Sequence, residues 1–279
     1  MSEKMKVSIP MENCEGCPAL VHLEQMGIRV DDFDRLVALA GNPNTGKSTL
    51  FNALTGLKQH TGNWPGKTVT RAEGGYQFNG VRYKLVDLPG TYSLLSASQD
   101  EEVARDFILF GQPDCTIVVT DATALERNLN LVLQVMEITD KVVVAVNLMD
   151  EARRKGLEVD VRSLSRDLGV PAVPITARTG EGLPTLLTTV AGVIEGEILT
   201  QPLRVGGTSE FQRAIDELTP LIEQAVPGIP NARWVAIRLL DGDARVQQAL
   251  QNGEFPALIQ RQRQAVTSFS RKMAVEGRQ

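Results

Sequence analysis

The chain has 279 residues and a formal net charge of −5, with 42% hydrophobic and 23% charged residues. This composition is typical of one or two folded domains and excludes a collagen-like, disulfide-dense or largely disordered chain. No stretch approaches the roughly 18 apolar residues that would predict a membrane span. The acidic balance argues against nucleic acid as the main partner. Three cysteines and no secretory signal favour the cytosol.

Residues 1–34 are expected to form an N-terminal extension with a CxxC motif, Cys14-Glu15-Gly16-Cys17, and a nearby histidine, His22. Structural zinc takes four protein ligands, and this group supplies three. A second copy of the chain, or transient contact with iron, could complete such a site. Two free thiols on a flexible arm are the simpler interpretation, so the motif is a weak metal candidate.

Residues 35–200 alternate short β-branched runs with helical patterns, which predicts a mostly parallel sheet with crossover helices. Asn79-Gly80 is the preferred type I′ turn and predicts an antiparallel hairpin at one edge of the sheet. We therefore expect an α/β fold with a six-stranded sheet. The expected strands are 36–40, 70–78, 82–87, 115–121, 142–147 and 172–176.

Residues 201–279 are expected to form a small all-α domain after a linker that contains Pro202 and two glycines. Ser209 is the expected N-cap of its first helix, because apolar residues at three- and four-residue spacing follow it. Two short helices should follow around Trp234 and Val246, and Pro256 should open a last one. The tail beyond is basic, which suits either a solvated helix face or an approach to a membrane surface.

The strongest motif is Gly41-Asn42-Pro43-Asn44-Thr45-Gly46-Lys47-Ser48, followed by Thr49, which fits the phosphate-loop pattern between an apolar strand and a helix. The backbone N–H groups of such a loop wrap a polyphosphate, and the start of the helix adds the positive end of its dipole. We expect Lys47 to reach the β- and γ-phosphates and the Ser48 hydroxyl to ligate Mg²⁺.

A second motif, Asp87-Leu88-Pro89-Gly90, ends the third expected strand. Asp87 is placed to hold Mg²⁺, and the Gly90 N–H could sense a γ-phosphate. The hydroxyl of a threonine that lies between the two motifs in the sequence should complete the Mg²⁺ shell. In Gly66-Lys67-Thr68-Val69-Thr70 we favour Thr68 as the Mg²⁺ ligand, with Thr61 and Thr70 as alternatives.

Two further motifs are candidates for recognising the base of a bound nucleotide. In Asn147-Leu148-Met149-Asp150, the Asp150 carboxylate can accept hydrogen bonds from N1–H and the 2-amino group of guanine, whereas adenine has no such donor pair. Thr176-Ala177-Arg178 follows the last strand, where its backbone amides could contact the guanine O6. The four motifs in this order predict a GTP-binding domain of the Ras-like superfamily.

The next residues after Gly90 are Thr91 and Tyr92, where many G proteins carry a glutamine that orients the attacking water. Neither side chain replaces that amide. Slow intrinsic hydrolysis, or a different catalytic device, is therefore expected.

These motifs resemble the cytosolic G-protein domain of the bacterial ferrous-iron transporter FeoB. The resemblance covers about residues 36–260. It implies a G domain, a helical domain that slows GDP release, and a membrane permease as partner, on the cytoplasmic side of the inner membrane. Besides the motifs above, it rests on His60-Thr61-Gly62-Asn63-Trp64-Pro65-Gly66, Thr91-Tyr92-Ser93-Leu94, Leu125-Glu126-Arg127-Asn128-Leu129 and Trp234-Val235-Ala236-Ile237-Arg238-Leu239-Leu240.

The resemblance also implies a role for one position, Asn44. Some members of the family use K⁺, held by a phosphate-loop asparagine, and Asn44 occupies that position; stabilising the loop turn is the alternative role. Leu148 stands where many G proteins have lysine, which predicts modest affinity and fast exchange. A soluble GTPase of ribosome assembly or tRNA modification, and a GTP-binding module with incidental turnover, remain alternatives. The oligomeric state is left open.

Overall fold

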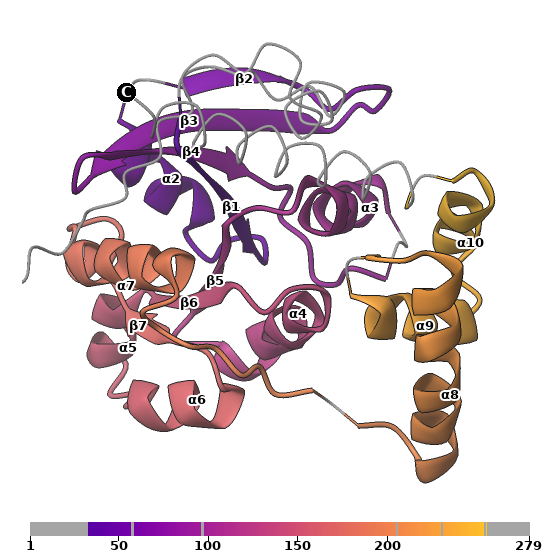
Figure 1. The fold of residues 1–279 in the computed structure, drawn as a ribbon. Coiled ribbons are helices and arrows are strands. Elements are labelled where there is room, and N and C mark those ends of the chain that lie inside the picture. The colour runs from indigo at the N-terminus through magenta and orange to yellow at the C-terminus, as the bar shows by residue number, and fades with distance from the viewer. Residues whose placement is uncertain are drawn as a thin grey trace, which may run out of the picture.

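The computed structural model describes residues 33–56, 59–95, 98–204, 206–229, 231–253 and 255. Its centre is a seven-stranded sheet with the order β2-β3-β4-β1-β5-β6-β7 (Figure 1). Strands β4, β1, β5, β6 and β7 run parallel to one another. The strands are β1 (Arg35–Gly41), β2 (Gln59–Asn63), β3 (Thr70–Phe78), β4 (Val81–Asp87), β5 (Cys115–Asp121), β6 (Val142–Asn147) and β7 (Ala172–Pro174).

One edge of the sheet is antiparallel, as the hairpin turn predicts. Asn79 and Gly80 both have positive φ, 51° and 81°, as a type I′ turn requires, and they join β3 to β4. Strand β2 was not among the expected strands. It pairs antiparallel with β3 and extends this edge. The described part of the chain thus has the six expected strands and one more.

Helices cover both faces of the sheet (Figure 1). Leu50 and Phe51 of α2 and Leu186 and Val190 of α7 pack in one core cluster with β1, β5 and β6. The opposite face packs against α3, α4 and the π-helical turn η1 that continues α3. The helices of this part are α2 (Lys47–Thr55), α3 (Gln99–Asp106), η1 (Phe107–Gly111), α4 (Leu125–Ile138), α5 (Met149–Arg154), α6 (Val161–Leu168) and α7 (Leu183–Glu195).

Three further helices, α8 (Ser209–Ala225), α9 (Ala232–Leu240) and α10 (Ala244–Gln251), pack beside α3 and α4 (Figure 1). Ile215, Trp234 and Val246 of these helices belong to the same core cluster as α3 and α4, so the helical part is continuous with the sheet part. The expected cap of α8 was wrong by one residue. The hydroxyl of Thr208, not Ser209, accepts from the Phe211 N–H at 3.2 Å.

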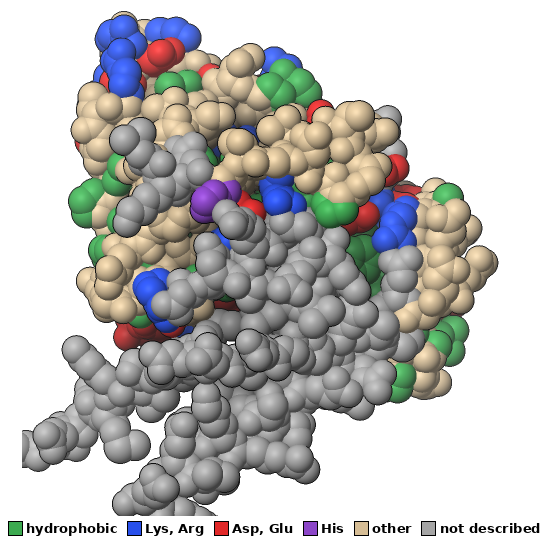
Figure 2. Space-filling model, turned by 90° about the horizontal axis from the view of Figure 1, so that it is seen from above, with side chains coloured by type: hydrophobic (Ala, Val, Ile, Leu, Met, Phe, Trp, Pro, Cys, Tyr) green, Lys and Arg blue, Asp and Glu red, His purple; other side chains and the backbone are tan. Residues whose placement is uncertain are grey.

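No helix in the described part of the chain is long and apolar enough to cross a membrane. On the side of the molecule seen in Figure 2, lysine, arginine and acidic side chains are scattered over the described surface in small groups of both signs. Cys14, Cys17 and His22, and the basic tail after Pro256, lie outside the described residues.

Candidate functional site

The phosphate loop lies between β1 and α2, with two residues in the left-handed region, Asn44 (φ 66°) and Gly46 (φ 81°). Thr45 donates its hydroxyl to the carbonyl of Asn42 at 2.9 Å, which closes the turn. A Cβ on Gly46 would lie 2.3 Å from Nδ2 of Asn147, so both the backbone conformation and the contact require glycine. Ser48 is exposed in the first turn of α2, where the backbone N–H groups of a helix are free to bind an anion.

Lys47 contacts the second motif. Its ammonium donates to the carboxylate of Asp87 and to the carbonyl of Leu88, the latter at 2.7 Å. The exposed fractions of the two charged side chains are 10% and 16%. Burial raises the pKa of Asp87 above its ordinary value, and the charge of Lys47 partly offsets that rise. The hydroxyl of Ser48 and the carboxylate of Asp87 are hard oxygen donors of the kind that Mg²⁺ prefers, so this site fits the ion.

The Asp87-Leu88-Pro89-Gly90 segment packs directly on the phosphate loop. The N–H of Thr91 donates to the carbonyl of Gly41 at 3.3 Å. A Cβ on Gly90 would lie 3.5 Å from the Cα of Pro43, so the two loops are in contact at this point. The structure therefore brings together the two motifs that the sequence assigns to phosphate and Mg²⁺.

Asn147 joins the two base-reading motifs to the phosphate loop. Its side chain is buried, donates to the carbonyl of Thr45 at 2.8 Å and accepts from the N–H of Ala177 at 3.0 Å. Asp150, in the first turn of α5, accepts from Nη2 of Arg178 at 3.0 Å. The structure thus brings all four motifs to the carboxyl ends of the parallel strands, the usual location of ligands in open α/β sheets.

The segment around Thr68 lies against α3. The Thr68 hydroxyl is exposed and 3.4 Å from Oε1 of Gln99, and Nζ of Lys67 is 2.5 Å from the carboxylate of Glu102. Trp64 is buried edge-on to Phe107 at 5.5 Å between ring centroids. The structure therefore places Thr68 beside α3, next to a buried tryptophan. The alternatives lie in the edge strands, Thr61 in β2 and Thr70 at the start of β3.

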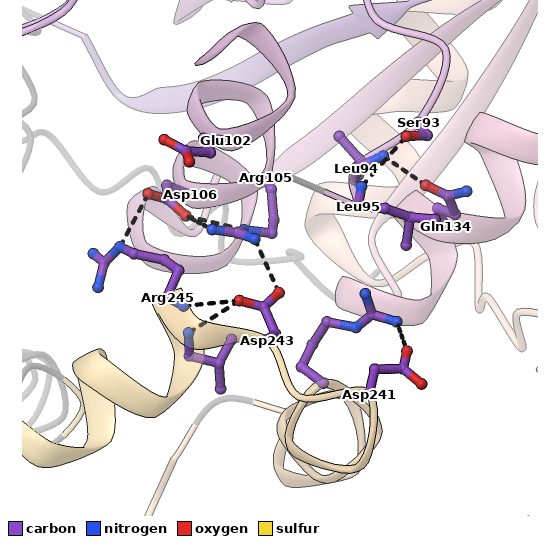
Figure 3. A network of polar contacts seen from close by, with 12 residues as sticks. Ser93, Leu94, Leu95, Glu102, Arg105, Asp106, Gln134, Asp241, Asp243 and Arg245 are labelled. Carbon is purple, nitrogen blue, oxygen red and sulfur yellow. Dashed lines mark hydrogen bonds and ion pairs between the residues drawn. The ribbon is translucent and has the colours of Figure 1, made fainter. Parts of the chain in front are cut away.

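A polar network that was not predicted from the sequence joins α3 to the helical part (Figure 3). Arg105 is fully buried, and its guanidinium pairs with Asp106 at 3.0 Å and with Asp243, before α10, at 3.1 Å. Arg245 lies 3.5 Å from the other oxygen of Asp106. On the same helix, Glu101 accepts from the hydroxyl of Ser93, which follows the second motif, at 2.8 Å. No local sequence pattern predicts the pairing of Arg105 with Asp243, because the two residues are 138 positions apart.

The chain matches two family models. Residues 35–190 match Ferrous iron transport protein B, and residues 208–277 match the FeoB cytosolic helical domain. The Fe(2+) transporter FeoB of Escherichia coli strain K12 is 38% identical over 211 residues, which are 74% of this chain and 27% of that protein. A FeoA/FeoB fusion protein of Porphyromonas gingivalis is 39% identical over 79% of this chain and 26% of its own length. The chain therefore spans about a quarter of these relatives.

Solved structures of FeoB cytosolic domains are similar to the whole described architecture. A GDP form of the T. maritima domain is 34% identical with a TM-score of 0.72, over 85% of this chain and 97% of that one. The L. pneumophila domain is 35% identical with a TM-score of 0.70, over 80% of this chain and 87% of that one. From its sequence motifs, its fold and these matches, the chain belongs to the FeoB family of ferrous iron transport proteins.

Proposed function

We propose that residues 35–200 bind GTP with Mg²⁺ and hydrolyse it. The observation that carries this proposal is Asn147, whose side chain holds the phosphate loop and the loop of Thr176-Ala177-Arg178 together. Similar proteins support it, since the T. maritima domain has been solved in GDP and GMPPNP forms and an S. thermophilus NFeoB mutant bound to GDP. Membership of the family favours this function over ribosome assembly or tRNA modification.

In the proposed site each motif has a separate task. The loop N–H groups and Lys47 bind the β- and γ-phosphates, and Lys47 would exchange its contact with Asp87 for one with phosphate. Ser48, Asp87 and Thr68 would hold Mg²⁺, which supplies positive charge against the negative charge that develops on the phosphate oxygens. Thr68 would have to leave Gln99 to do so. The N–H of Gly90 would face the γ-phosphate, and Asp150 would accept from the guanine base.

We propose that K⁺ at Asn44 supplies the positive charge that an arginine supplies in other G proteins. Asn44 is exposed at the tip of the phosphate loop. Thr91, the residue after Gly90, is buried and has no amide with which to orient a water molecule. The test is GTP turnover in K⁺ and in Na⁺ buffer for the wild type and for Asn44→Ala. Stimulation by K⁺ that Asn44→Ala abolishes is the expected result, and equal slow rates in both buffers would contradict the role of K⁺.

At the level of the whole protein, we propose that this GTPase regulates ferrous iron transport by a membrane permease, from the cytoplasmic side. The support within the chain is α3. It contacts the helical part through Arg105 (Figure 3), the loop of Thr68 through Glu102 and Ser93 through Glu101. A change of the loops on GTP binding would thus reach residues 201–279 through one helix. The domain limits 1–34, 35–200 and 201–279 are part of this proposal.

A further inference from the structure

The carboxylate assigned to guanine recognition already has a partner within the chain. Oδ2 of Asp150 accepts from Nη2 of Arg178 at 3.0 Å, and Nη2 of Arg154 lies 3.7 Å from the same oxygen. The side chain of Asp150 is only 23% exposed, whereas that of Arg178 is 73% exposed. Arg178 therefore reaches a partly buried carboxylate from a largely solvated position.

The loop that carries Arg178 is fixed by other contacts. The N–H of Thr176 donates to the carbonyl of Glu181 at 2.9 Å, and the N–H of Ala177 donates to Asn147. Arg153 of α5 pairs with the carboxylate of Glu181, with Nη1 to Oε2 at 3.2 Å. Because these contacts hold the backbone, the side chain of Arg178 can leave Asp150 while its loop stays in place.

The chemistry of the two partners is alike. The N1–C2–N2 edge of guanine is itself a cyclic guanidine, with two N–H groups directed at a carboxylate, and the side chain of arginine presents the same donor pattern. The oxygens of Asp150 cannot serve both partners fully, so the arginine and the base are alternatives.

We infer that Arg178 competes within the chain for the guanine-binding carboxylate of Asp150 and so lowers the affinity for guanine nucleotides. This inference rests on the proposed function and names a residue that tunes the same site. The site binds guanine in proportion to the fraction of molecules in which Arg178 has released Asp150. An exposed ion pair of ordinary strength corresponds to about a two- to fivefold reduction in apparent affinity. The contact also speeds exchange, because it offers Asp150 a replacement partner when the base departs.

The test is the kinetics of fluorescent GDP binding to the full chain, followed by stopped flow in wild type, Arg178→Met and Arg154→Met. Methionine keeps an apolar stem and removes the donors. Arg154 is the matched control: it carries the same charge, and its Nη2 lies 3.7 Å from the carboxylate of Asp150, beyond hydrogen-bond distance, while its Nε donates only to the backbone carbonyl of Asp150. We expect Arg178→Met to bind GDP about two- to fivefold tighter, through faster association or slower dissociation. The difference should shrink as salt rises from about 0.05 to about 0.5 M.

Three results would overturn the inference or its basis. Weaker binding and faster dissociation in Arg178→Met would show that Arg178 holds the base instead of competing with it. An equal change in Arg154→Met would show a general effect of charge on an anionic ligand. Failure of the wild type to bind fluorescent GDP, with the fold intact by circular dichroism, would contradict the proposed function itself.

Discussion

The side-chain amide of Asn147 donates a hydrogen bond to the backbone carbonyl of Thr45, 102 residues earlier in the chain. With its other end it accepts from the N–H of Ala177, so one buried residue ties the start of the nucleotide site to its end. These bonds hold the phosphate loop and the base-reading loop at a fixed separation.

Replacement of Asn147 by alanine should therefore affect stability and binding together. It leaves the Thr45 carbonyl and the Ala177 N–H without partners, which costs about 2–4 kcal/mol in the free energy of unfolding. Urea denaturation measures this loss, and GDP titration should show weaker binding. Asn130→Ala, which removes an exposed amide that contacts Gln134, is the control. A loss from Asn147→Ala no larger than that of the control would contradict this role.

The close contact at Gly46 predicts a specific cost for one methyl group. Gly46 and Gly80 have the same φ of 81°, but a Cβ on Gly46 would lie 2.3 Å from Asn147, whereas nothing lies within 4 Å of one on Gly80. Gly80→Ala should cost about 1 kcal/mol for the backbone conformation alone. Gly46→Ala should cost more in thermal denaturation and should weaken GDP binding. Equal losses of stability and unchanged binding would show that the contact has no importance.

The buried pair of Arg105 and Asp243 should stabilise the folded state far more than a surface pair does. Arg105→Met removes a partner from the carboxylates of Asp243 and Asp106. The free energy of unfolding should fall by about 3–5 kcal/mol. Burial already raises the pKa of Asp106 above its ordinary value despite both arginines nearby. A double-mutant cycle with Asp243→Asn measures the coupling.

The exposed pair of Arg166 and Asp167 provides the control for this cycle, since pairs of that kind contribute about 1 kcal/mol or less. A coupling energy between Arg105 and Asp243 as small as that of the control would mean that the network does not join α3 to the helical part.

Cys115 gives a prediction for pH. The thiol is fully buried in β5, and burial raises its pKa from 9.0 to about 12. The unfolded chain therefore releases this proton first, so the thiol contributes no pH dependence below pH 9 and favours unfolding progressively between pH 9 and 12. Alkylation with iodoacetamide at pH 9, followed by peptide mass spectrometry, should leave Cys115 unmodified in the folded protein and modified in denaturant. Rapid modification of Cys115 in the folded protein would contradict its burial.

Much of the sheet could be predicted because its central strands are buried on both faces. Strands β5 and β6 are rich in apolar and β-branched residues and have the predicted ends. Strand β2 could not be found in this way, because Gln59–Asn63 is polar and becomes a strand through backbone pairing with β3. The cap of α8 was misplaced because Thr208 and Ser209 are adjacent and both can cap a helix.

The order of the four motifs along the chain predicted their grouping in space, because the carboxyl ends of neighbouring parallel strands meet at one edge. The contacts of Arg105 with Asp243, of Lys67 with Glu102 and of Arg178 with Asp150 were not predictable from spacing. Each joins charged residues of separate elements, and charged residues are common throughout the sequence. Only the folded chain shows which of them meet.

The central claim is that the four motifs form a binding site specific for guanine nucleotides. Calorimetric titration of the full chain with GDP and with ADP, both with Mg²⁺, tests it most directly. We predict that GDP binds with micromolar rather than nanomolar affinity. ADP should bind at least about a hundredfold more weakly than GDP, because it leaves the carboxylate of Asp150 without donors. Equal affinity for the two nucleotides, or no binding of GDP, would contradict the account.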